Sequence, residues 1–93
     1  MAVRQFAAAG VYTLYCPSIK LGPGGPALMR KHSIRPTDIR EGGRFHAVAV
    51  EHAGHLKALM RMAGSDNAEV ACRRALEMYG PSGFLVKDMV VGR

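Results

Sequence analysis

Three stretches of the chain have the residue pattern that is typical of β-strands. Residues 11–19 are rich in β-branched and aromatic side chains, and a period of two extends back to residue 3. Residues 44–52 alternate with largely apolar side chains on both faces, which indicates a central strand. Residues 83–91 are the third apolar stretch. Pro17 cannot donate a hydrogen bond to a neighbouring strand, so we expect it at the edge or the end of the first strand.

Apolar positions spaced three or four residues apart predict two main helices between the last two strands. The first covers residues 55–62 and should end at Gly64. The second should begin after Asp66, a natural N-cap, and end at Gly80, where Pro81 cannot continue a helix. Small side chains on its apolar stripe would let this helix lie close to a sheet (Ala68, Ala71, Cys72, Ala75).

Two shorter helical segments precede the central strand. A Gly/Pro-rich turn over residues 21–26 leads into a short helix at 27–32, and a single helical turn is expected within 35–43. The predicted order is therefore strand, short helix, strand, helix, helix, strand. We expect one α+β domain over residues 1–93: a small three-stranded sheet, mixed or antiparallel, with two main helices packed on one face, plus a short helix.

The excess of basic residues indicates what kind of partner the protein binds. The 93 residues contain 13 Lys and Arg against 7 Asp and Glu, a formal net charge of +6. Nine of the 13 are arginine, whose planar fork suits phosphates, carboxylates and stacking on bases. Six basic residues fall in the loop-rich segment between the first two strands (Lys20, Arg30, Lys31, Arg35, Arg40, Arg44). Arg73 and Arg74 project from the last helix as a second patch, and Tyr12 and Tyr15 could stack bases or anchor an interface.

The spacing of the histidines gives a weaker indication of a metal site. Glu51, His52 and His55 place three potential metal ligands within five residues, but their spacing is not that of a His-Glu-x-x-His site. We favour polar residues at a strand end and a helix start, and keep the three as weak metal candidates. Neither a Walker loop nor a dinucleotide-binding fingerprint occurs in the sequence, so no cofactor is expected.

The two cysteines and the hydropathy of the chain indicate the cellular compartment of the protein. Cys16 and Cys72 both lie among apolar or small residues, which favours buried free thiols, with a single disulfide as the alternative. No apolar run of about 18 residues occurs, so we expect no membrane span. The N-terminal residues lack the continuous apolar stretch of a secretory signal, and this predicts a cytoplasmic protein.

Together these patterns predict a non-enzymatic, basic binding module whose partner is an acidic macromolecule: nucleic acid, a nucleoprotein complex or an acidic protein surface. Two alternatives remain open. One is a small regulator, inhibitor or adaptor, such as a mobile element encodes, that acts by protein–protein binding; homodimerisation through a strand edge is compatible with either reading. The other is a metal-binding protein or enzyme that uses Glu51, His52 and His55.

Overall fold

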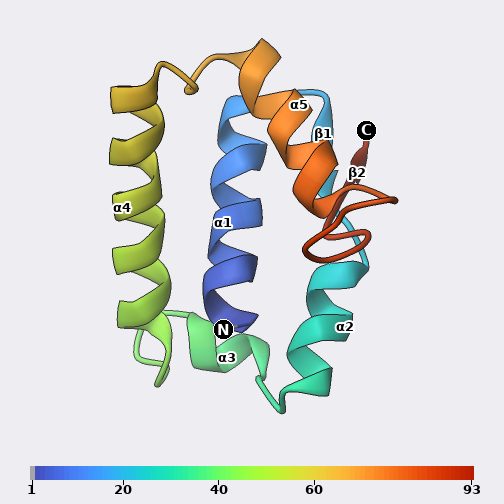
Figure 1. Ribbon diagram of the computed structural model, residues 1–93. Helices are drawn as coiled ribbons and strands as arrows, with labels where there is room; N and C mark the ends of the chain where they lie inside the picture. Colours follow the sequence, from blue (N-terminus) through green and yellow to red (C-terminus); the bar gives the residue numbers. More distant parts are fainter. Residues whose placement is uncertain (1) are drawn as a thin grey trace.

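The structure is mainly helical. It is a computed structural model, and residues 2–93 are described. They form five helices and two short strands (Figure 1). In chain order these are α1 (Ala2–Tyr15), β1 (Ile19–Leu21), α2 (Gly24–Lys31), α3 (Pro36–Ile39), α4 (His46–Ala63), α5 (Ala68–Tyr79) and β2 (Val90–Gly92).

Helix α1 is the centre of the molecule. It contacts α4 along most of its length, and it also packs on α5, α2 and β1 (Figure 1). Ala8 and Ala9 on α1 are buried in the same cluster as Ala71 and Ala75 of α5. Such small side chains let two helix backbones approach closely. The small residues of α5 therefore serve close packing against a helix and not, as the sequence predicted, against a sheet.

The predicted first strand is wrong. Residues 11–15 belong to α1, and the only strand nearby, β1, begins at Ile19. Val11 and Tyr12 are both buried because α1 has neighbours on several sides. A short apolar run inside such a helix has the same composition as a strand, and periodicity alone does not separate the two.

The central strand is also wrong. Residues 46–52 form the first half of α4, which continues without a break through the helix predicted at 55–62. The apolar side chains that suggested two covered faces lie on different sides of α4: Ala49 is buried, whereas Val50 is exposed. β-Propensity depends on context, and the packing of α4 on α1 overrides it here.

The three-stranded sheet is contradicted as a consequence. Of the third predicted strand, only its end lies in β2, and residues 83–89 form turns. β2 pairs antiparallel with β1 over three residues, with Lys20 opposite Val91. This two-stranded sheet is too small to support a layer of helices, so the fold is a set of helices around α1.

Several local predictions are confirmed. The single turn α3 occurs where expected, and α4 ends at Gly64, whose φ of 69° is left-handed. The short helix α2 also occurs, but it begins at Gly24, three residues earlier than expected, within the predicted Gly/Pro-rich turn. Helix α5 also occurs, but its N-cap is Asn67 and not Asp66, and the Asn67 side chain accepts a hydrogen bond from the Val70 amide. Within residues 2–93, none of the helices has the length and hydropathy needed to cross a membrane.

The two cysteines form a disulfide, so the expectation of free thiols is wrong and the alternative holds. Cys16 follows the last turn of α1 and Cys72 lies on α5, 56 residues further along the chain. The Ser18 hydroxyl lies 3.3 Å from the Cys16 sulfur. Because both sulfurs are in the bond, neither is available as a nucleophile. The disulfide joins the end of the central helix to the helix that packs beside it.

Candidate functional site

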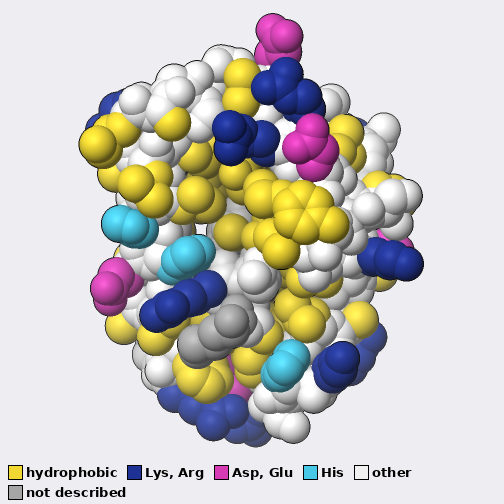
Figure 2. Space-filling model, viewed as in Figure 1, with side chains coloured by type: hydrophobic (Ala, Val, Ile, Leu, Met, Phe, Trp, Pro, Cys, Tyr) yellow, Lys and Arg dark blue, Asp and Glu magenta, His cyan; other side chains and the backbone are white. Residues whose placement is uncertain are grey.

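Five of the basic residues singled out in the sequence gather at one end of the molecule. They lie in the last turn of α2, at both ends of α3 and in the segment that enters α4, all at the bottom of Figure 1. Figure 2 shows Lys and Arg side chains along this lower edge. We call this surface the basic end; it consists of Arg30, Lys31, Arg35, Arg40 and Arg44, all exposed.

The buried carboxylate of Asp38 contacts two residues of the basic end and holds them in place. Asp38 accepts a hydrogen bond of 2.9 Å from the Arg35 amide and forms an ion pair of 3.4 Å with Arg44. The amide hydrogen bond, followed by the Arg44 guanidinium, lowers the pKa of Asp38, so the carboxylate stays ionised. Arg44 also donates to the Ser33 carbonyl and lies over the Phe45 ring, 4.6 Å from its centre. These contacts hold Arg44 in place.

The remaining basic candidates lie elsewhere. Lys20 is on β1, and Arg73 and Arg74 are on α5; all three are exposed, and neither element belongs to the end formed by α3. Tyr12 is only 5% exposed and packs against Tyr79, with ring centres 6.3 Å apart. A ring so placed is part of the core and has no open face for a base. Tyr15 is half-buried.

A second feature is a groove on the face shown in Figure 2. Its floor is α1, one wall is α4, and the other wall is the end of α5 with the loop that follows (Figures 1 and 2). The groove has two lobes that share Arg4 and His52. The basic lobe, about 410 Å³, is lined by Arg4, Val48, Glu51, His52 and His55. The apolar lobe, about 280 Å³, is lined further by Ala8, Tyr12, Leu56, Met78, Tyr79 and Leu85.

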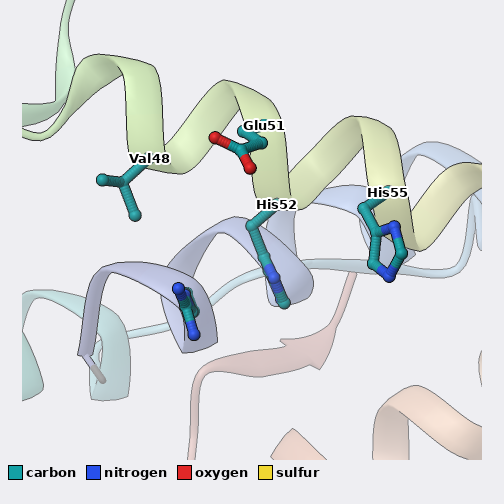
Figure 3. A pocket seen from close by; sticks show the side chains of 5 residues that line it. Val48, Glu51, His52 and His55 are labelled. Atoms are coloured by element: carbon teal, nitrogen blue, oxygen red, sulfur yellow. The ribbon is translucent and has the colours of Figure 1, made fainter.

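Apart from Arg4 of α1, the side chains of the basic lobe come from a single face of α4. Figure 3 shows His52 directed from α4 toward α1, with His55 one turn further along on the same side. Burial, and then the charges of Arg4 and His55, lower the pKa of His52. A neutral imidazole is therefore favoured while the lobe is empty, and a negative charge placed there would favour the imidazolium.

The three weak metal candidates do meet in this lobe. Glu51, His52 and His55 line it together, because a helix covers the segment where a strand end and a turn were expected. Within residues 2–93, however, no group of three or more His, Cys, Asp or Glu side chains is arranged to hold a metal ion. Arg4 lines the same lobe, and its positive charge opposes a cation.

Sequence reasoning missed the contribution of α1 to the groove. Arg4, Ala8 and Tyr12 all line it, and they recur every four residues, which is the spacing of one helix face. Gln5 on the same helix accepts a hydrogen bond of 2.5 Å from the buried Tyr79 hydroxyl. The four-residue spacing was a usable signal, but residues 3–19 had been interpreted as a strand.

Comparison of the chain with models of known protein families, with curated proteins and with solved structures finds no match in any of the three. The functional argument therefore depends on the geometry of the basic end and of the groove.

Proposed function

We propose that this protein is a small, non-enzymatic binding module whose basic end engages an acidic macromolecule, namely nucleic acid or a nucleoprotein complex. The observation that supports this proposal is that the five residues of the basic end, which come from the end of α2, both ends of α3 and the segment before α4, all lie exposed at one end of the molecule. Residues 30–44 contain only Asp38 and Glu41 as acids, and Asp38 is already neutralised within the fold.

Phosphate contacts of this kind have a recognisable dependence on salt. A protein that neutralises phosphates releases condensed counterions, so its affinity falls steeply with salt concentration. If all five residues of the basic end meet phosphates, the affinity for duplex DNA should fall about 500-fold between about 50 and 200 mM salt. Fluorescence anisotropy with a labelled generic duplex and a labelled single strand measures this slope.

Two matched triple variants test whether the basic end is the surface that contacts nucleic acid. Arg30, Lys31 and Arg40 are exposed, and changing all three to Gln removes three charges while leaving the Asp38–Arg44 ion pair intact. We expect this variant to bind at least tenfold more weakly, with a shallower salt slope. The control changes three equally exposed basic residues outside the basic end to Gln (Lys20, Arg73, Arg74).

Three outcomes contradict the proposal. Undetectable binding of both probes at low salt would remove nucleic acid as the partner. An equal loss in the two triple variants would show that only net charge matters. A greater loss in the control would move the contact to α5, where Arg73 and Arg74 were predicted as a second patch.

A second candidate function is a regulator, inhibitor or adaptor that binds another protein. The observation that favours it is the exposure of large apolar side chains, including Met62 at 83% and Phe84 at 72%. Binding of this kind is less sensitive to salt and would be retained in the triple variant of the basic end. Homodimerisation through a strand edge belongs to this proposal, and light scattering would show it as a doubled mass.

The compartment is a separate part of the proposal. The sequence predicts the cytoplasm, whereas the Cys16–Cys72 disulfide is typical of proteins in oxidising compartments. Labelling of free thiols in freshly lysed cells distinguishes the two: a cytoplasmic protein should react at both cysteines, and a protein in an oxidising compartment should react at neither.

A further inference from the structure

The groove between α4 and α5 has a polar half and an apolar half in direct continuation. Arg4 and His52 stand where the two lobes meet. Beyond them the walls carry Leu56 from α4, Met78 from α5 and Leu85 from the loop after α5. Figure 2 shows this division: apolar atoms surround the upper part of the hollow, and His and basic side chains border its lower part.

A groove with one polar half and one apolar half suits a ligand that has a polar head and an apolar tail. We propose that the groove binds a single-chain amphiphile with a carboxylate head, of the fatty-acid type, with the head in the basic lobe and the alkyl chain in the apolar lobe. Sites for small molecules are concave and mostly apolar, with a few convergent polar groups that orient the ligand.

The head group is assigned from the charges of the basic lobe. The Arg4 guanidinium can hold a carboxylate with two parallel hydrogen bonds, and the imidazoles of His52 and His55 can add donors from α4. Glu51 is the one acid that lines the lobe, and Figure 3 shows its carboxylate beside the α4 ribbon, whereas His52 points toward α1. An anion can therefore meet the cationic side of the lobe without lying against Glu51.

The tail is assigned from the size and lining of the apolar lobe. At about 280 Å³ the apolar lobe lies just below the usual range for small-molecule sites, which suits one alkyl chain better than the paired chains of a phospholipid. Gln5 also lines this lobe, and its side-chain oxygen is already engaged, because it accepts a hydrogen bond from the Tyr79 hydroxyl. Leu56, Met78 and Leu85 are partly exposed, so a chain laid across them removes apolar surface from water.

The electrostatics of His52 agree with this assignment. Burial, Arg4 and His55 lower its pKa, and Glu51 is the acid on α4 that lines the same lobe. From α1 and α5 the neighbouring titratable groups, besides Arg4, are the hydroxyls of Tyr12 and Tyr79; phenols are neutral at pH 7, and burial raises the pKa of both further. A carboxylate bound beside Arg4 would oppose the effect of the Arg4 charge on His52 and favour the imidazolium form.

The test is a titration of the isotope-labelled protein with decanoate, followed by amide chemical shifts. We expect saturable shifts on α1, on α4 and after α5, in the residues that line the two lobes. Decanol, which has the same chain and no charge, is the comparison. Arg4→Gln should weaken decanoate binding about tenfold, because Gln lacks the charge and can replace only one of the two hydrogen bonds of the guanidinium, and it should leave decanol binding unchanged.

A matched pair of leucine variants tests the tail. Leu85 lines the apolar lobe and is 47% exposed, whereas Leu21 on β1 is 45% exposed and lines neither lobe. Leu85→Ser should weaken decanoate and decanol alike, and Leu21→Ser should change neither. Both leucines are partly exposed, so both variants should fold, and circular dichroism checks this first.

The proposal is overturned if decanoate produces no saturable shifts below its micellar concentration, or if Arg4→Gln weakens decanol as much as decanoate. It is also overturned if an acidic amphipathic helical peptide binds in the groove and decanoate does not, because the groove would then belong to a protein partner. Changing Arg30, Lys31 and Arg40 to Gln should leave decanoate binding intact, which keeps this test separate from that of the basic end.

Discussion

At the scale of single residues, two ionisable side chains have environments that their sequence neighbours do not reveal. Asp38 is ionised and buried because it accepts a hydrogen bond from the Arg35 amide and pairs with Arg44. His52 is turned into the groove, where burial and Arg4 disfavour its charged form. The partners of Asp38 lie three and six residues away, at the start of α3 and after its end, whereas the environment of His52 also includes Arg4 on α1 and therefore depends on the packing of α4 on α1.

The lowered pKa of His52 predicts a dependence of stability on pH. The unfolded chain binds a proton at His52 near pH 6.5, whereas the folded protein binds it only at lower pH. This contribution to stability is therefore complete above about pH 6.5 and is lost as the pH falls through the folded pKa. His52→Gln should flatten the decrease in unfolding free energy between about pH 7 and 5.

Urea denaturation at a series of pH values measures this effect. His32 is exposed and outside the groove, so His32→Gln is the control and should leave the profile of the wild type unchanged. A His52→Gln profile parallel to that of the wild type over the whole range would contradict the prediction.

At the scale of elements, α2 and α4 end in the same hydrogen-bonded turn with different residues at its left-handed position. In α4 the Ser65 amide donates to Met60 and Gly64 has a φ of 69°. In α2 the Ile34 amide donates to Met29 in the same way, but Ser33 occupies the position with a φ of 57°. A left-handed conformation is strained for serine and not for glycine.

Exchanging the two residue types should therefore have opposite effects on the stability of the protein. Ser33→Gly should stabilise the protein by about 1 kcal/mol, and Gly64→Ser should destabilise it by about 1–2 kcal/mol. Thermal unfolding followed by circular dichroism gives both values. A loss of stability in Ser33→Gly would show that the Ser33 backbone is not strained.

At the scale of the whole molecule, the fold depends on one central helix and one covalent link. Helix α1 touches most of the other elements, and the Cys16–Cys72 disulfide closes a segment that includes α2, α3 and α4. A link across 56 residues restricts the unfolded chain strongly. A domain of this size has a thin core, so this restriction is a large part of its stability.

Reduction should therefore destabilise the protein by about 2–4 kcal/mol. Urea denaturation with and without a reductant measures the difference. The double variant Cys16→Ala and Cys72→Ala is the control, because it should have the lower stability in both conditions. Equal stability of the oxidised and reduced wild type would mean that the link contributes nothing.

The sequence by itself determined the local and additive properties of this protein. The net charge follows from residue counts, and α2, α3, α5 and the end of α4 follow from short-range signals such as Pro26, Gly64 and the small stripe of α5. Caps and turns depend on residues a few positions apart, so they can be predicted before the fold is known.

Only the tertiary structure decided the rest. Residues 11–15 and 46–52 have apolar side chains that suit a strand or a buried helix, and their packing on one another as α1 and α4 selects the helix. The packing of helices around α1 also brings Arg4 beside His52 and joins Cys16 to Cys72. These juxtapositions link residues far apart in the chain, and sequence spacing carries no information about contacts that long-range packing creates.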